Sequence, residues 1–79
     1  MSFGFDLDLL KTYAAVVDSG GFTKAAERVH LTQSTVSQQI KKLEGNLGTL
    51  LLRRDKSTGT IETTEAGELL LSYARRLRS

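Results

Sequence analysis

The sequence has no cysteine, no proline and no tryptophan, and it has a single histidine, His30, among its 79 residues. Without cysteine the chain cannot form a disulfide or a thiolate metal site, and nucleophilic or metal-assisted catalysis lacks most of its usual side chains. His30 has no second histidine or cysteine with which to bind a metal ion, so we interpret it as a turn residue packed beside neighbouring helices. We expect no metal and no other cofactor, and an enzyme is the least favoured class of function.

Long hydrophobic runs are also missing. No apolar stretch approaches a membrane span of roughly 18 residues. The N-terminus contains Asp6 and Asp8 and lacks the basic flank and apolar stretch of a targeting signal. These absences predict a cytoplasmic protein with no membrane partner. A chain of 79 residues forms one domain at most, and its core is small enough that a partner subunit is a usual source of further burial.

The net charge is only +2, but the positive charges are concentrated in the middle of the chain. Residues 31–56 carry five basic and two acidic side chains, a surplus of +3, whereas residues 1–30 sum to −1 and residues 57–79 are balanced. By itself this surplus fits either an ordinary solvated surface or a basic patch that binds an anionic partner.

Hydrophobic periodicity predicts four helices. Each helix follows an N-cap residue, and these are Asp6, Thr23, Thr32 and Thr64. Glycines mark the ends of the first and third helices, at Gly20, Gly21 and Gly48. The residues predicted to be buried recur every three or four positions. They are Leu10, Tyr13, Ala14 and Val17 in the first helix, Ala25, Ala26 and Val29 in the second, Val36, Ile40, Leu43 and Leu47 in the third, and Ala66, Leu70, Tyr73 and Leu77 in the last.

The pattern changes between the third and last helices. Two short extended runs, residues 50–54 and 60–63, flank a polar tip that contains Gly59, an arrangement that predicts a β-hairpin. The complete order is helix, helix, three-residue turn, helix, hairpin, helix. This order predicts a mainly α fold with a small β-hairpin wing, a winged helix-turn-helix followed by a linker helix.

The outer face of the third helix differs from an ordinary exposed face. At about 100° per residue, Ser34, Ser37, Gln38 and Lys41 lie opposite the apolar stripe, with Gln33 at the N-terminal edge. Hydroxyl and amide side chains can hydrogen-bond to base edges in a major groove, and a lysine can reach phosphate or guanine. An ordinary exposed face has more Glu and Lys pairs, so the pattern favours DNA reading over a face that contacts nothing.

These features together resemble the LysR-type transcriptional regulators. The segment 22–44, with the sequence FTKAAERVHLTQSTVSQQIKKLE, is similar to the helix-turn-helix signature of that family. The family's downstream landmarks are matched by Leu47-Gly48, Leu52, Arg54 and Thr64-Glu65-Ala66-Gly67. The resemblance implies a bacterial regulator that binds duplex DNA in a promoter or operator and senses a small molecule through a larger C-terminal domain. We expect that effector-binding domain to be absent from this chain.

The resemblance also implies how the chain is divided. Residues 1–63 form the winged helix-turn-helix domain, with the helix-turn-helix at 22–41 and the wing at 50–63. Residues 64–79 begin a linker and dimerisation helix. The recognition helix, residues 33–46, would lie in the major groove and the wing near the minor groove.

Specific DNA contacts follow from the family pattern. Bases in the major groove would be contacted by Gln33, Ser34, Ser37 and Gln38. The DNA backbone would be contacted by Thr23, Lys24, Thr35, Lys41 and Lys42, and Thr32 would also contact the DNA. The wing would contribute Arg53, Arg54 and Lys56, although it is about two residues longer than usual and has no Arg at its tip. Gln38 replaces a common Arg, so its preference should lean away from guanine.

The last helix would form the interface of a homodimer, or of a tetramer in the full-length protein. The predicted interface residues are Ala66, Leu69, Leu70, Tyr73 and Leu77. The alternative is that this stripe packs entirely on the first helix of the same chain. Two other functions stay open: a winged helix of another regulator family, such as a molybdate- or antibiotic-responsive one, and a helical protein-interaction module that binds no DNA.

Overall fold

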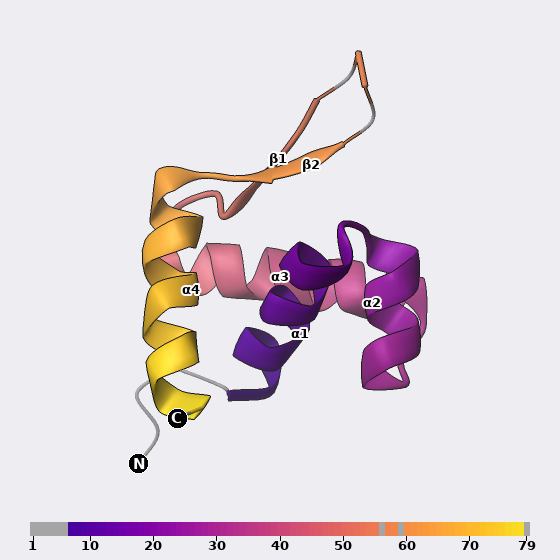
Figure 1. Ribbon diagram of the computed structural model, residues 1–79, viewed down its shortest axis with the longest axis horizontal. Coiled ribbons are helices and arrows are strands. Elements are labelled where there is room, and N and C mark those ends of the chain that lie inside the picture. Colours follow the sequence, from indigo (N-terminus) through magenta and orange to yellow (C-terminus); the bar gives the residue numbers. More distant parts are fainter. Residues whose placement is uncertain (1–6, 56, 59, 79) are drawn as a thin grey trace.

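Four helices and one two-stranded antiparallel sheet form the part of the chain that the computed structural model describes, residues 7–55, 57–58 and 60–78, with side chains up to residue 76. The predicted fold class is confirmed. In chain order the elements are α1 (Leu7–Ser19), α2 (Phe22–Val29), α3 (Gln33–Leu47), β1 (Leu52–Arg54), β2 (Ile61–Thr63) and α4 (Glu65–Arg78). Figure 1 shows the hairpin projecting from the helices, which pack together on one side of it.

The core is built around α1, which packs against α2, α3, α4 and β2. Tyr13 and Val16 of α1 are completely buried. Val36 of α3 is buried to the same extent, and so is Leu51, which lies just before β1. Because α1 is enclosed from several directions, its buried arc is wider than one stripe and includes Leu9. The remaining core residues are Leu10, Ala15, Ala25, Ala26, Ile40, Leu43, Leu70, Leu71 and Ala74.

All four predicted stripes are only partly right, and on α2 Val29 is half-buried at the edge of the core. On α1, Ala14 and Val17 are half-buried at the edge of the core. On α3, Leu47 is 39% exposed because it is the last residue of the helix and lies beyond the packed region. On α4, Tyr73 is 51% exposed, and Leu71 and Ala74 are buried instead, so the packed face lies one position away from the predicted one.

The helix ends show both a confirmed cap and an error. Thr32 caps α3 as predicted, because its side-chain oxygen accepts the Thr35 N–H at 3.1 Å. The predicted cap Thr23 is wrong. The N-cap of α2 is Gly21, in an extended conformation, and its carbonyl oxygen already accepts the Ala25 N–H at 3.2 Å. Thr23 therefore lies inside the helix, and the predicted cap Asp6 lies outside the described residues.

The turn between α2 and α3 uses His30 in an uncommon conformation. His30 has a φ of 60°, in the left-handed region, and the Leu31 N–H behind it donates to the Ala26 carbonyl at 3.0 Å. The prediction of a turn residue is confirmed. Its side chain is exposed, however, so the predicted packing beside the helices is wrong.

The hairpin is shorter than predicted, with three residues in each strand. Its register pairs Leu52 with Thr63, Arg53 with Glu62 and Arg54 with Ile61. Residues 50 and 51, which we expected in the first strand, make hydrogen bonds to other parts of the fold instead. No helix in the described part of the chain combines the length and the apolar character needed to span a membrane.

Candidate nucleic-acid interface

The two faces of α3 have different environments. Val36, Ile40 and Leu43 are buried against the core. The predicted DNA-contact residues of this helix lie on the remaining surface, where Thr35 and Ser37 are half-buried and the others are exposed. The exposed ones are Gln33, Ser34, Gln38, Lys41 and Lys42. The predicted separation of an apolar inner face from a polar outer face is confirmed.

The N-terminus of α3 is capped by the Thr32 side chain. The Thr32 hydroxyl accepts the Thr35 N–H and donates to the Thr35 hydroxyl oxygen at 2.8 Å. The Thr35 hydroxyl hydrogen is then directed away from Thr32. The first N–H groups of a helix lack intrahelical acceptors and carry partial positive charge. Thr23 and Lys24 are exposed on the preceding helix, α2.

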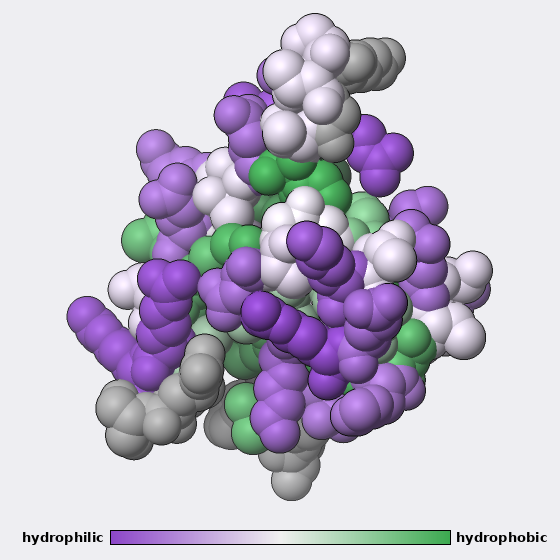
Figure 2. Space-filling view, turned by 45° about the vertical axis from the view of Figure 1, so that its right-hand side comes forward, coloured by the Kyte–Doolittle hydropathy of each residue, from purple (hydrophilic) through white to green (hydrophobic). Residues whose placement is uncertain are grey.

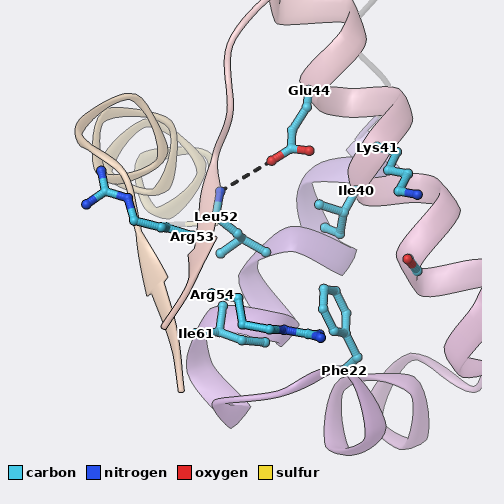
Figure 3. A pocket seen from close by; sticks show the side chains of 9 residues that line it. Phe22, Ile40, Lys41, Glu44, Leu52, Arg53, Arg54 and Ile61 are labelled. Atoms are coloured by element: carbon cyan, nitrogen blue, oxygen red, sulfur yellow. Dashed lines mark hydrogen bonds between the residues drawn. The ribbon is translucent and has the colours of Figure 1, made fainter. Parts of the chain in front are cut away.

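A groove of about 230 Å³ lies between α3, the start of α2 and the hairpin. Ser37 and Lys41 line it from α3, and Arg53 and Arg54 line it from β1. Figure 3 shows Arg54 pointing toward Phe22, while Arg53 points to the other side of the strand. The floor of the groove is apolar and is formed by Phe22, Ile40, Leu52 and Ile61. Figure 2 shows a hydrophobic area below the hairpin, with hydrophilic side chains around it.

The two arginines of β1 therefore differ. Arg53 is paired across the sheet with Glu62, and residues directly opposite each other project from the same face. Arg54 is paired with Ile61 and faces the groove beside Lys41. The side chain of Arg54 is therefore the better placed of the two arginines to act together with α3.

Leu51, which is completely buried just before β1, bonds the base of the hairpin to the helices. Its N–H donates to a Glu44 carboxylate oxygen at 2.8 Å. Its carbonyl oxygen accepts the Tyr13 hydroxyl at 3.0 Å and the Thr64 N–H at 3.2 Å. Gly67 lies against the same place, because a Cβ atom added there would overlap the Tyr13 hydroxyl and the Leu51 carbonyl. We call Tyr13, Glu44, Leu51, Thr64 and Gly67 the Leu51 junction.

The electrostatics of the junction follow from its burial. Burial raises the pKa of Tyr13 to about 12, and the negative charges of Glu44 and Glu68 add to this shift. The Tyr13 hydroxyl therefore keeps its proton and remains a donor to Leu51. Thr64 also caps α4 as predicted, since its side-chain oxygen accepts the Gly67 N–H at 3.1 Å while its hydroxyl donates to the Leu50 carbonyl at 2.6 Å.

The tip of the hairpin is exposed and is held by local hydrogen bonds. The Asp55 carboxylate accepts the Ser57 hydroxyl at 2.7 Å and the Ser57 N–H at 2.9 Å. These bonds lower the pKa of Asp55 below its ordinary value. The Asp55 N–H donates to the Thr60 carbonyl at 2.9 Å. Lys56, a predicted DNA contact, lies outside the described residues.

The exposed face of α4 differs from the predicted interface by one residue. Leu69 is 70% exposed, Tyr73 is 51% exposed and Ala66 is half-buried, at positions that share one side of a helix. Leu70 was predicted in this stripe but is only 8% exposed, because it packs on the core of its own chain. The side chain of Leu77 lies outside the described residues. We call Ala66, Leu69 and Tyr73 the α4 apolar face.

Two residues of α3 have structural contacts that the sequence pattern did not reveal. Gln39 is turned toward α1, and its side-chain oxygen accepts the Thr12 hydroxyl at 2.5 Å. Glu44 holds the Leu51 backbone. The position of Glu44 in the sequence could have indicated such a contact. A carboxylate in the last turn of a helix is electrostatically unfavourable unless a hydrogen-bond donor compensates for it. Within the described residues, no three or more His, Asp or Glu side chains are grouped so that they could hold a metal ion.

Comparison with known proteins gives consistent matches. Residues 7–68 match the family described as bacterial regulatory helix-turn-helix protein, lysR family. The chain is 46% identical over 74 residues to the HTH-type transcriptional regulator HdfR of Escherichia coli O139:H28, an alignment that covers 94% of this chain and 26% of HdfR. The chain therefore spans about a quarter of the length of the curated relatives that it matches.

Solved structures with the same fold include protein–DNA complexes. The crystal structure of the CbnR_DBD–DNA complex superimposes with a TM-score of 0.83 and 37% identity, covering 92% of this chain and 82% of that chain. The BenM_DBD/catB site 1 DNA complex gives a TM-score of 0.84 and 37% identity, covering 92% and 79%.

Proposed function

Because the chain belongs to the lysR family of bacterial regulatory helix-turn-helix proteins, we propose that it is the sequence-specific, duplex-DNA-binding part of a transcriptional regulator. The family is one of regulators and is no enzyme class, and we propose no catalytic step and no cofactor for this chain. The DNA-binding unit is residues 1–63, and residues 64–79 begin the linker helix. Its place of action is the bacterial cytoplasm, where promoter DNA lies.

The observation that carries this proposal is the outer face of α3. Gln33, Ser34 and Gln38 are exposed there, with Ser37 half-buried beside Lys41 at the edge of the groove. Amide and hydroxyl side chains on one side of a helix match the donors and acceptors of base edges in a major groove. CbnR and BenM, which share this fold, have been solved in complexes with DNA.

The remaining contacts follow from the position of α3. With this helix in the major groove, Thr23, Lys24, Thr32, Thr35 and Lys42 contact the DNA backbone. Arg54 and Lys41 flank the groove between α3 and the wing, so the wing approaches the adjacent DNA. The narrow minor groove of A·T-rich DNA attracts such cations. Arg53 and Lys56 contribute further positive charge from the wing.

We also propose that the protein acts as a dimer through the α4 apolar face. Leu69 and Tyr73 expose a large apolar area on the side of α4 that does not pack on the core. Such an area on a small domain usually marks an interface. A symmetric dimer would present two copies of α3 to half-sites about 34 to 36 Å apart, one turn of DNA.

A salt titration of binding to random-sequence duplexes tests the proposal. The 79-residue chain should bind at low salt, and the logarithm of the affinity should fall linearly with the logarithm of the salt concentration. Arg54→Ala should reduce that slope by about one, the value for one phosphate contact. Lys11→Ala, which removes the same charge from an exposed residue of α1, is the control for altered net charge.

The main rival is a protein-interaction module that uses the same α4 apolar face without DNA. The observation that favours it is the exposure of Leu69 and Tyr73, which any protein partner could cover. No retention on duplex DNA even at low salt would contradict the DNA-binding proposal and support this rival.

A further inference from the structure

Glu44 lies in the last turn of α3, where a carboxylate has two electrostatic disadvantages. The carbonyl groups at the C-terminus of a helix carry a partial negative charge that repels it. If α3 enters a major groove, DNA phosphates add to this repulsion. A carboxylate at this position therefore needs contacts that compensate for both effects.

The structure provides those contacts in the chain that follows the helix. Gly48 adopts a left-handed conformation with a φ of 71° and turns the chain back, and the N–H groups of Gly48 and Thr49 donate to the Glu44 carbonyl at 2.8 and 3.2 Å. The returning chain then passes the Glu44 side chain. One carboxylate oxygen accepts the N–H of Leu51 at 2.8 Å and the N–H of Leu52 at 3.3 Å. The dashed line in Figure 3 marks a bond from the carboxylate to the wing strand.

These bonds fix the point from which the wing starts. Leu52 is the first residue of β1, and Arg54 lies two positions further along. Side chains two apart in a strand project from the same face, so Leu52 and Arg54 both line the groove. The direction of Arg54 relative to α3 therefore depends on how the Leu52 backbone is held.

The other members of the Leu51 junction cannot replace this contact. The Tyr13 hydroxyl and the Thr64 N–H both donate to the Leu51 carbonyl, so they tie the wing to α1 and α4. Glu44 is the member of the junction that comes from α3. It connects the wing directly to the helix that we propose to read the bases.

We propose that Glu44 is a positioning residue for the DNA interface, which fixes the wing against α3 and directs Arg54 toward the DNA that flanks the major-groove site. This inference rests on the proposed function. Glu44 acts through the Leu51 and Leu52 backbone and needs no contact with DNA.

The proposal predicts the direction in which DNA affinity changes when the Glu44 carboxylate is removed. A carboxylate that merely lies near DNA would repel it, so its removal would strengthen binding. A carboxylate that positions the wing would weaken binding when it is removed. Glu44→Gln separates the two effects further, because it removes the charge and keeps a carbonyl oxygen that can accept from Leu51 and Leu52.

The first experiment measures the affinity of the 79-residue chain for a duplex obtained by selection from random sequences. We expect Glu44→Ala to weaken binding about tenfold and Glu44→Gln to stay within about threefold of the original chain. The matched control, Glu27→Ala, removes the same charge from the exposed surface of α2 and should not weaken binding. Unchanged or tighter binding by Glu44→Ala would overturn the proposal.

A double-mutant cycle tests whether Glu44 acts through the wing. If Glu44 directs Arg54, then Glu44→Ala should cost less than about twofold in a chain that already carries Arg54→Ala. Hydroxyl-radical footprints should show that Glu44→Ala loses protection at the flanks of the site and keeps it at the centre. Additive losses, or equal loss of protection across the whole site, would contradict a positioning role.

A measurement without DNA keeps this inference separate from the proposed function. In the free chain, Glu44→Ala should shift the Leu51 and Leu52 amide proton resonances upfield and speed their exchange with solvent, while the amides of residues 36–43 stay protected. In Glu44→Gln, the Leu51 and Leu52 amide shifts and exchange rates should return part of the way to those of the original chain. If the alanine variant does not fold, the same two measurements on Glu44→Gln test the inference. Unchanged Leu51 and Leu52 amides would overturn the inference even if DNA binds. Failure of the original chain to bind any duplex would instead overturn the proposed function.

Discussion

The base and the tip of the wing are held in different ways. At the base, the Leu51 backbone is bonded to residues from three helices or their caps, and its side chain is completely buried. At the tip, the hydrogen bonds of Asp55, Ser57 and Thr60 run to partners within residues 55–60, and these side chains lie at the surface. Orientation is therefore set at the base, and the tip can change in sequence or length without disturbing the helices.

The largest expected effect on stability comes from Gly67, which makes the closest contact at the base of the wing. Gly67→Ala would drive a methyl group into the Tyr13 hydroxyl and the Leu51 carbonyl, so we expect the free energy of unfolding to fall by about 3 kcal/mol. The matched control is Gly45→Ala in α3, where an added Cβ has no atom within 4 Å. That change should raise stability by about 0.5 to 1 kcal/mol through helix propensity. Urea denaturation of both variants measures the difference, and equal effects would mean that the base is not closely packed.

The next largest effect is a loss of folding stability at alkaline pH, which comes from the Tyr13 hydroxyl. The pKa of Tyr13 is raised to about 12, above its ordinary value of 10.0, so the unfolded chain loses this proton at lower pH than the folded chain. Stability from this group is complete below pH 10 and falls as the pH rises from about 10 toward 12. We expect a loss of about 1.4 kcal/mol by pH 11.

Tyr13→Phe isolates this contribution. The variant should be less stable than the original chain at pH 8. The difference between their free energies of unfolding should narrow as the pH is raised to 11. Denaturation midpoints at the two pH values provide the measurement. A gap that stays constant would show that the Tyr13 hydroxyl is not held in the neutral form by the fold.

A smaller effect is expected at Thr64, which caps α4 and bonds to the Leu50 carbonyl. Thr64→Ala should reduce the free energy of unfolding by about 1 kcal/mol, whereas Thr64→Ser keeps the hydroxyl and should recover most of it. Thermal denaturation followed by circular dichroism compares the two. If serine is no better than alanine, the hydroxyl contributes nothing to the base.

The smallest effect belongs to the tip. Asp55→Ala removes an exposed carboxylate whose partners lie within residues 55–58, so the unfolding midpoint should stay within experimental scatter. The Ser57 amide should nevertheless exchange faster, because it loses its acceptor. A clear drop in the midpoint would remove the distinction between base and tip.

Sequence reasoning located the helices and the polar face of α3 because both depend on local periodicity and capping. It misplaced part of α4, since positions 66, 70, 73 and 77 and positions 67, 70, 71 and 74 both satisfy helical spacing. Only packing decides between them, and Gly67 is the residue that lets the chain approach closely. The cap Thr23 was wrong because Gly21 can adopt the extended conformation without a side-chain bond.

The role of Glu44 could not be read from the pattern for a different reason. Its bonds to Leu51 and Leu52 depend on the chain reversal at Gly48, which brings residues seven and eight positions apart together. Tyr13 and Leu51 are 38 positions apart, so their bond depends on the packing of α1 beneath the wing. Such contacts between distant residues determine the geometry of the site, whereas the residue types of its surface were apparent from the sequence.

The most direct test of the central claim is base discrimination by the exposed face of α3. Competition binding with the selected duplex and single-base variants of it should show that Gln38→Ala loses discrimination at one or two positions while its affinity for random duplex stays nearly the same. If Gln33→Ala, Ser37→Ala and Gln38→Ala all keep the full discrimination of the original chain, α3 does not read the bases and the account is contradicted.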